Sequence, residues 1–228
     1  MSHEPNHPLN RATKRLGQIL GLSDYTTSAW SGGSTTELVS YPAGADFSSR
    51  QFLWRLSIAN VEKDGAFTRF ENIQRILMVL KGGINLTHEG EYDCALLPFE
   101  QDKFSGNFQT CAKIKQGGAT NLNLMLKEGS AGEMLHIALE SGQSHSYALV
   151  DGVASSEEAH TFSQAVDLLY CVDGEAQIRH SNSPQEFCIH PEESFVFSRN
   201  STGSNGEMLI HNSCNTLANI IAVRIIHT

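Results

Sequence analysis

The chain has 228 residues, which suits one large or two small domains, and 40% of them are hydrophobic, enough for a substantial core. Only 18% are charged, and the formal net charge is −9. Because Lys and Arg neither predominate nor cluster, the composition argues against nucleic acid or an anionic membrane as the main partner.

The first residues and the cysteines indicate a cytoplasmic protein. The opening segment MSHEPNHPLN is polar and has no apolar core of a signal peptide. No apolar run approaches the length of a membrane span, and the best candidate, 217–226, has the length of a strand. The cysteines are odd in number, scattered, and without a C-x-x-C motif, at positions 94, 111, 171, 188 and 214. We therefore predict reduced, mostly buried thiols.

Helical periodicity is scarce along the chain. One helix is predicted, over 10–20, and the segment 163–166 is too short to assign. Elsewhere, apolar runs of four to nine residues are separated by Gly, Asn, Asp or Ser, which is typical of an all-β sandwich or barrel. In chain order, the predicted strands are 35–41, 51–60, 75–80, 84–87, 121–127, 133–140, 168–172, 195–198, 208–211 and 218–227.

Two segments of the sequence resemble each other. RILMVLKGGINL (75–86) aligns without gaps on DLLYCVDGEAQI (167–178), and Gly82 falls on Gly174. The alternative is that any two β-hairpins look alike. Farther along, however, FSGN meets FSRN at nearly the same offset, which favours a true internal repeat.

The repeat predicts two homologous β units. The first would span 12–130 and contain the ligand site, and the second would span 131–228, with the boundary near 129–132. An apolar strand that ends in a polar residue and Gly, followed by a second strand, an acidic turn and F-x-F, resembles the cupin barrel. The fold class that this implies is all-β, with two tandem cupin-like barrels or sandwiches (a bicupin) and little helix.

The cupin resemblance allows the metal-ligand positions of that fold to be read on this sequence. In the second half they fall on His160, Phe162 and Asp167, with the last near Gly203. One histidine and one carboxylate are too few for a catalytic metal site, which needs at least three protein ligands. We therefore expect the second metal site to be degenerate.

In the first half no metal ligand occupies these positions. They fall on Thr68, Phe70 and Arg75, with Thr110 near the fourth and Gly82 as the glycine. A cation thus stands where a cupin carboxylate would bind the metal. The ten histidines form no H-x-H pair. We predict neither a metal nor another cofactor.

Several motifs together resemble the HutD/Ves family. They run from residue 30 to residue 125 in matching order and spacing: WSGGSTTELVSYP (30–42), FLWRLSIANVEKDGAFTRF (52–70), RILMVLKG (75–82), LLPF (96–99) and TNLNLM (120–125). The second half resembles the family only in architecture. Many members begin the first motif with W-[KR]-N-G-G-G-x-T, whereas here Ser31 replaces the basic residue and the segment is shorter, so contacts of that Lys or Asn are not carried over.

This resemblance implies a cytoplasmic bicupin without a required metal. Members of the family are associated with histidine-utilisation operons, where a regulatory role has been proposed, and with stress responses. Binding of small anions, formate or N-formylglutamate-like, in the first barrel is suggested for them. No catalytic activity is established for the family, and we assign no catalytic residue here.

The strand predicted over 51–60 carries one side of the expected site. Alternation places Trp54 and Leu56 on a core face, and Arg55 and Ser57 on the other face among small apolar residues. That second face suits the mouth of a cup. The alternative is a surface arginine on an edge strand.

Arg75 begins an otherwise apolar strand at a position that points into the cup in cupins. Arginine suits carboxylates because its planar fork forms bidentate hydrogen bonds and keeps its charge. Two arginines, Arg55 and Arg75, facing one cavity would make an anion site. The alternative is that such an arginine pairs with a structural acid such as Glu37 or Asp64.

Polar and aromatic neighbours complete the predicted ligand site. Asn121 and Asn123 share one strand face, although Asn is depleted in strands. Ser57 and Thr36 would add neutral donors, and Trp30 and Phe67 would form apolar walls. The predicted ligand-binding residues are therefore Arg55, Arg75, Asn121, Asn123, Ser57, Thr36, Trp30 and Phe67.

Two enzymatic alternatives remain open. One is a metal-independent cupin isomerase, lyase or hydrolase acting on a small acid or sugar, with His136, His145 or His160 as its acid/base group. The other is a metal-dependent bicupin dioxygenase. There is no G-x-S-x-G, and Gly32-Gly33 fits neither a P-loop nor a dinucleotide-binding motif. The expected partner is a small carboxylate, and a homodimer is left open.

Overall fold

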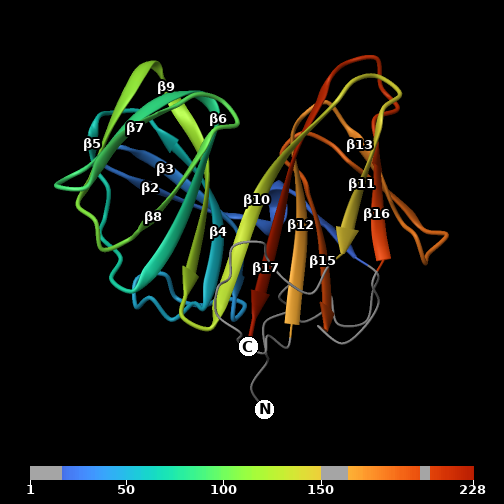
Figure 1. Cartoon of the computed structure of the whole chain (residues 1–228), viewed down its shortest axis with the longest axis horizontal. Coiled ribbons are helices and arrows are strands. Elements are labelled where there is room, and N and C mark those ends of the chain that lie inside the picture. Colours follow the sequence, from blue (N-terminus) through green and yellow to red (C-terminus); the bar gives the residue numbers. More distant parts are fainter. Residues whose placement is uncertain (1–16, 150–163, 201–205) are drawn as a thin grey trace. The chain divides into compact units, whose positions relative to one another are not determined.

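The computed structural model describes residues 17–149, 164–200 and 206–228, and these ranges consist mostly of β-strands (Figure 1). One short 3₁₀ helix, η1 (Leu22–Asp24), is the helical element among them. The helix predicted over 10–20 is wrong at 18–20, which form strand β1 (Gln18–Leu20), and residues 10–16 lie outside the described ranges. Among the described residues, no helix is long and apolar enough to cross a membrane.

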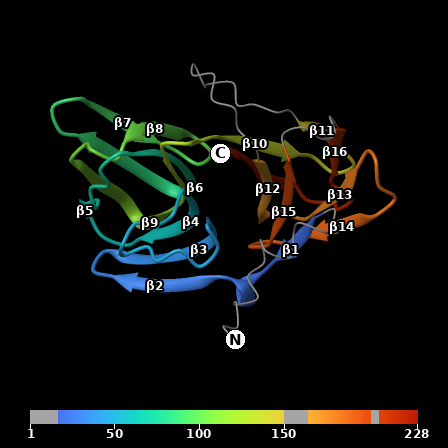
Figure 2. The same ribbon diagram turned by 90° about the horizontal axis from the view of Figure 1, so that it is seen from below.

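The chain divides into two compact units. The first unit, Tyr25–Glu128, contains a sheet in the order β2-β3-β4-β9-β6-β7, with β5 pairing β9 and β8 pairing β6. Seen from below, this sheet curls, with β2 and β3 on one side and β7 and β8 on the other (Figure 2). Its strands are β2 (Thr26–Trp30), β3 (Gly33–Tyr41), β4 (Trp54–Val61), β5 (Gly65–Ala66), β6 (Ile73–His88), β7 (Tyr92–Leu96), β8 (Gln101–Ser105) and β9 (Thr110–Lys127).

Two long strands, β6 and β9, give this unit its curvature. The strands predicted separately over 75–80 and 84–87 are one strand, β6, whose pairing with β9 shifts register twice, between Val79 and Lys81 and between Gly82 and Ile84. Such bulges bend a strand and increase its twist. The first half of β6 pairs with β8 and the second half with β7.

Gly82 is required at the bend for two reasons. Its φ is +79°, and a Cβ atom there would lie 2.2 Å from the carbonyl oxygen of Gly118 on β9. Its predicted counterpart, Gly174, also has a positive φ, +71°, and a Cβ there would lie 2.6 Å from Cα of Ala218. The two halves of the predicted repeat thus place a glycine in the same conformation against a neighbouring strand.

Gly82→Ala is expected to lower the free energy of unfolding by roughly 2–5 kcal/mol, because a strained φ and a backbone clash add up. Gly90 is a matched control, since its φ is also +79° but a Cβ there would meet nothing within 4 Å. Gly90→Ala should cost only about 1–2 kcal/mol. Urea unfolding of both variants measures the difference, and equal losses would contradict a role for the close approach to Gly118.

The second unit comprises the described residues 17–24 and those from Gly129 onward. One sheet has the order β1-β15-β12-β17-β10 and the other β11-β16-β13-β14. Side chains from both sheets form one apolar cluster, which is a sandwich core. Besides β1, its strands are β10 (Ser130–Leu139), β11 (Ser144–Leu149), β12 (Gln164–Asp173), β13 (Ala176–His180), β14 (Glu186–Ile189), β15 (Ser194–Asn200), β16 (Gly206–His211) and β17 (Ala218–His227).

The division into units differs from the predicted domains at the N-terminal side. The two units meet in sequence at Glu128 and Gly129, close to the predicted 129–132. Residues 17–24, however, were expected in the first domain and belong to the second unit, because β1 pairs with β15 through Gln18↔Val196. A three-residue strand carries no signal of its own that tells which sheet it joins.

Candidate functional site

The pairing of β4, β9 and β6 brings the predicted polar residues onto one face of the first unit. Arg55 of β4 lies opposite Met125 of β9, which lies opposite Arg75 of β6. Ser57 lies opposite Asn123 in the same way. Because side chains alternate along a strand, residues at these paired positions project to the same side of the sheet.

This face lines a cavity of about 250 Å³. One of its lining residues, Phe67, packs against an apolar cluster that includes Leu77, Val79 and Phe104. The cavity is therefore a cup of polar and aromatic side chains next to the apolar core. The lining residues are Ser28, Ala29, Trp30, Thr35, Phe47, Arg55, Ser57, Ala59, Val61, Ala66, Phe67, Thr68, Phe70, Arg75, Asn121, Asn123 and Met125.

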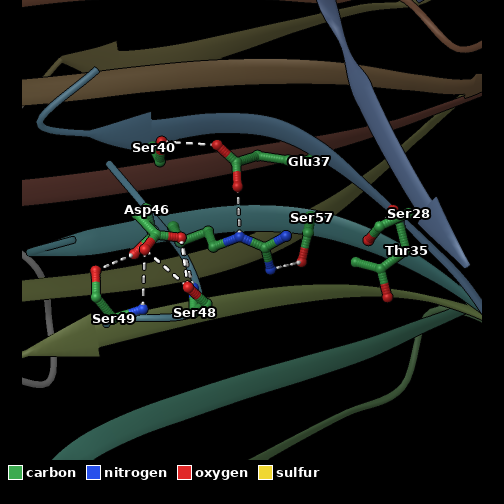
Figure 3. A network of polar contacts seen from close by, with 9 residues as sticks. Ser28, Thr35, Glu37, Ser40, Asp46, Ser48, Ser49 and Ser57 are labelled. Atoms are coloured by element: carbon green, nitrogen blue, oxygen red, sulfur yellow. Dashed lines mark hydrogen bonds and ion pairs between the residues drawn. The ribbon is translucent and has the colours of Figure 1, made fainter. Parts of the chain in front are cut away.

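Arg55 is buried and its charge is compensated. Its Nε donates to Oε2 of Glu37 at 2.7 Å, and its Nη1 donates to the hydroxyl of Ser57 at 3.0 Å. Ser40 donates to the other oxygen of Glu37, so this carboxylate is held on both sides (Figure 3). The guanidinium also lies over the ring of Phe47, 4.2 Å from its centroid. The alternative that an arginine of the cup pairs with a structural acid such as Glu37 therefore holds for Arg55.

Arg75 is equally buried but has no carboxylate partner among the described residues. Its Nε and Nη2 both donate to Oδ1 of Asn123, at 3.2 and 3.1 Å. Its other neighbours are three rings, with centroids at 5.0, 5.3 and 5.8 Å, of Phe104, Phe67 and Phe70. Burial lowers the pKa of Arg75 to about 10, so the side chain is still a cation at neutral pH. The cup thus contains a buried positive charge that no acid in the described part of the chain neutralises.

Asn121 adds a second unmatched donor. It is 2% exposed and lies on the cup face of β9, opposite Ala59. Its Nδ2 is buried and has no hydrogen-bond partner within the described ranges. A buried polar group without a partner costs about 1–3 kcal/mol. A bound acceptor in the cup would remove this cost at Asn121 while it neutralises Arg75.

The hairpin of β2 and β3 forms the rim of the cup. Trp30 pairs with Gly33 across a two-residue turn, and its indole Nε1 donates to Oγ1 of Thr35 at 3.1 Å. A Cβ at Gly32 would lie 2.2 Å from the Trp30 ring, and one at Gly33 1.9 Å from the carbonyl of Asn60. The two glycines therefore let the indole and the next strand approach closely.

Comparison with known proteins matches this chain to one family. The HutD family model matches residues 22–216.

The chain belongs to the HutD family.

Two relatives share part of its sequence. An uncharacterized 21.2 kDa protein in the hutC 3′ region of Pseudomonas putida is 38% identical over 110 residues, 47% of this chain and 57% of that protein. Protein Ves of Escherichia fergusonii is 30% identical over 108 residues, 46% of this chain and 54% of Ves. The matches thus span little more than half of these two relatives. The resemblance to the HutD/Ves family inferred from the motifs is confirmed.

Solved structures match the fold of nearly the whole chain. A conserved protein of unknown function from Pseudomonas aeruginosa PAO1 has a TM-score of 0.73 and 22% identity, over 92% of this chain and 98% of that one. HutD from Pseudomonas fluorescens SBW25 has a TM-score of 0.64 and 20% identity, over 93% and 99%. A variant of the oxalate decarboxylase of Bacillus subtilis has a TM-score of 0.62 at 8% identity, over 90% and 76%. The predicted all-β, cupin-like fold class is confirmed.

Seven of the eight predicted site residues line the cup of this HutD-family protein, and Thr36 does not. Thr36 lies opposite Ile58 on the other face of the sheet, and its hydroxyl contacts that of Thr27 at 2.9 Å. Its neighbour Thr35 lines the cavity in the position that was predicted for Thr36. Aromatic and small residues of the wall were not predicted, among them Phe47, which lies in a loop without strand periodicity.

The residues of the cup do not fit a metal ion. Of the four cupin ligand positions in the first half, Thr68, Phe70 and Arg75 line the cavity, while Thr110 bonds to His88 elsewhere in the unit. None of the lining residues is a His, Cys, Asp or Glu. A cation at Arg75 also repels a metal ion from this site.

In the second unit, Asp167 at the position equivalent to Arg75 is engaged by protein groups. It is fully buried and accepts hydrogen bonds from Nε of Arg224 at 2.8 Å, Nε of Arg199 at 3.3 Å and the hydroxyl of Tyr147 at 2.9 Å. Burial lowers the pKa of Arg224, but Asp167, Tyr147 and Glu133 together outweigh this, and the net shift of the pKa is upward. This carboxylate is a structural acid.

Of the other second-half positions, His160, Phe162 and Gly203 lie outside the described residues. Two of the histidines considered as acid/base groups are described. His136 bonds to Oδ1 of Asn219 at 2.8 Å, and His145 lies on β11. Neither lines the cup.

Proposed function

We propose that this HutD-family protein binds a small carboxylate metabolite, formate- or N-formylglutamate-like, in the cup of the first unit. Its role would be regulatory or sensory, in the cytoplasm, and linked to histidine utilisation. The observation that carries the proposal is Arg75, a buried guanidinium in a cavity whose lining contains no acid. A carboxylate would supply the missing negative charge.

The cup offers a carboxylate a consistent set of donors. Arg75 uses Nε and Nη2 for Asn123, so the remaining N–H groups of its guanidinium are the donors for a ligand. Nδ2 of Asn121 would donate to the same anion or to an acyl oxygen next to it. Trp30 and Phe67 would shield these hydrogen bonds from water, which strengthens them.

The cavity favours binding over acid/base catalysis. None of its lining residues is a group that titrates near neutral pH, such as a histidine or a perturbed carboxylate. The volume of about 250 Å³ suits a small metabolite.

The names of relatives support the link to histidine utilisation. One relative is encoded in the hutC 3′ region of Pseudomonas putida. The structure of HutD from Pseudomonas fluorescens SBW25 is one obtained in a formate condition. A role in sensing a small acid of that pathway is therefore the regulatory function that we propose.

Calorimetry with formate, N-formylglutamate and urocanate tests this function. Arg75→Met is expected to weaken binding at least about 100-fold, because two hydrogen bonds from a charged group contribute about 1.5–3 kcal/mol each. Arg179→Met is the matched control, since Arg179 is an exposed arginine of the second unit. Binding of these acids to Arg75→Met with wild-type affinity would contradict the proposal.

A further inference from the structure

A second cluster of chemically reactive side chains lies at the far end of β6 from Arg75. His88 ends β6, Cys94 lies on β7 and Asp102 lies on β8. One nitrogen of His88, Sγ of Cys94 and one oxygen of Asp102 all lie within 4.8 Å of one another. Three neighbouring strands of one sheet hold these atoms, so the cluster is built on rigid elements.

The distances within the cluster are close to those of a tetrahedral zinc site. Nε2 of His88 lies 2.9 Å from Oδ2 of Asp102, and Sγ of Cys94 lies 3.5 Å from the same oxygen. Zinc–ligand bonds of about 2.0–2.3 Å in a tetrahedron place N and O roughly 3.3 Å apart, and S and O roughly 3.5 Å apart. For these two pairs, movements of a few tenths of an ångström would give the zinc geometry, and the nitrogen and the sulfur lie within 4.8 Å of each other.

The surroundings of His88 are those of a metal-binding histidine. Its side chain is fully buried, and its Nδ1 lies 2.8 Å from the hydroxyl of Thr110. A ligating histidine ordinarily donates its other ring N–H to such an outer partner, which fixes the ring and leaves one nitrogen for the metal. The rings of Tyr92 and Phe104 pack on the imidazole at centroid distances of 4.6 and 4.5 Å and fix its orientation further.

A cysteine–histidine nucleophile is the competing interpretation of these residues. In that arrangement the thiol would bond to the imidazole, whereas here Cys94 and His88 both bond to Asp102. Burial and the negative charge of Asp102 raise the pKa of the Cys94 thiol to about 11, which opposes formation of a free thiolate. A divalent cation would compensate the charges of both the carboxylate and a thiolate.

We propose that His88, Cys94 and Asp102 bind Zn²⁺. A borderline-soft ion with no fixed geometric preference suits one nitrogen, one sulfur and one oxygen. Cys94 is half-buried and the Asp102 side chain is 13% exposed, so the ion has a path from solvent. Water or the hydroxyl of Tyr92, which lies 3.0 Å from Asp102, would complete the tetrahedron.

Titration of the reduced, chelator-treated protein with Zn²⁺ against a chromophoric chelator tests the site, with Co²⁺ as the spectroscopic probe. The wild type is expected to bind one tight equivalent, and its Co²⁺ form should show the charge-transfer band of a thiolate ligand. Cys94→Ser, nearly isosteric, should lose the band and bind Zn²⁺ more than about 100-fold less tightly. Thr110→Val, which removes only the outer partner, should weaken binding about 10–100-fold.

Cys188→Ser is the matched control, because Cys188 lies in a separate cluster with Glu175 and His190 in the second unit. It should keep both the band and the affinity. A wild type without tight Zn²⁺ binding would overturn the proposal, as would a band that survives in Cys94→Ser or disappears in Cys188→Ser. Thermal unfolding provides a second readout, since Zn²⁺ should raise the Tm of the wild type but not that of Cys94→Ser.

Discussion

Replacement of Asp167 with asparagine is expected to lower the free energy of unfolding by about 3–5 kcal/mol. Asp167 is fully buried and compensates two guanidinium groups, those of Arg199 and Arg224, which are 8% and 5% exposed. Removal of the negative charge leaves both cations in a poorly solvated site. Among the described residues, Arg224 then keeps Glu133, whose Oε1 lies 3.6 Å from Nη1, as its acidic neighbour. Urea unfolding of the purified variant measures the loss.

Glu186→Gln is the control for this prediction. Glu186 pairs with Arg179 at 3.8 Å, but both side chains are more than half exposed. Exposed pairs contribute about 0–1 kcal/mol, so this variant should unfold almost like the wild type. If Asp167→Asn lost no more stability than Glu186→Gln, the buried ion pairs would not be what stabilises this part of the second unit.

Alternation along a strand explains why much of the cup could be predicted from the sequence. In β4 and β9 the polar residues of the cup recur at every second position. Arg55 and Ser57 therefore share one face of β4, and Asn121 and Asn123 share one face of β9. The side on which these faces lie follows from the apolar residues between them. Pattern alone was therefore sufficient for two of the three central strands.

Thr36 shows where this reasoning fails. Both faces of β3 carry a hydroxyl, at Thr35 and Thr36, so the pattern does not distinguish them. The pairing decides: Thr35 lies opposite Ala59 on the cup side, and the register shifts between Glu37 and Val39. Register and bulges depend on the partner strand, and a single strand's sequence does not encode them.

The His88 cluster could not be predicted for a related reason. Its members lie on three strands, and two of these, β7 and β8, are short and lack a clear apolar pattern. The hairpin β6–β7 brings Cys94 opposite Leu86, and β8 folds back on β6 at a different place. The intervals of 6 residues from His88 to Cys94 and of 8 residues from Cys94 to Asp102 match no recognised metal-binding motif.

The internal repeat relates two opposite uses of one position. Arg75 lies opposite Met125 and Phe104, and its counterpart Asp167 lies opposite Arg224 and Phe197. In the second unit the charge on β12 is neutralised by the neighbouring strands. In the first unit the charge on β6 faces an amide and aromatic rings, and no acid among the described residues neutralises it.

Arg75→Met is therefore expected to weaken carboxylate binding while it changes the free energy of unfolding of the ligand-free protein by no more than about 1–2 kcal/mol, because the loss of an uncompensated buried charge offsets the hydrogen bonds that Asn123 loses. Burial lowers the pKa of Arg75 to about 10, so the charged form is disfavoured in the folded state. This cost is present at every pH below about 10 and decreases as the pH rises above it. Methionine fills a similar volume without charge, so it removes this cost together with the hydrogen bonds to Asn123. Urea unfolding at neutral pH without added acids measures the net change.

Arg55→Met separates this effect from the general loss of an arginine in the cup. Arg55 neutralises Glu37 at 2.7 Å, so its removal leaves a partly buried carboxylate without its cation and should destabilise the protein. The same substitution in one cavity is thus expected to cost much more stability at Arg55 than at Arg75. Equal losses in the two variants would contradict the interpretation of Arg75 as an uncompensated charge, and with it the reason for placing the carboxylate there.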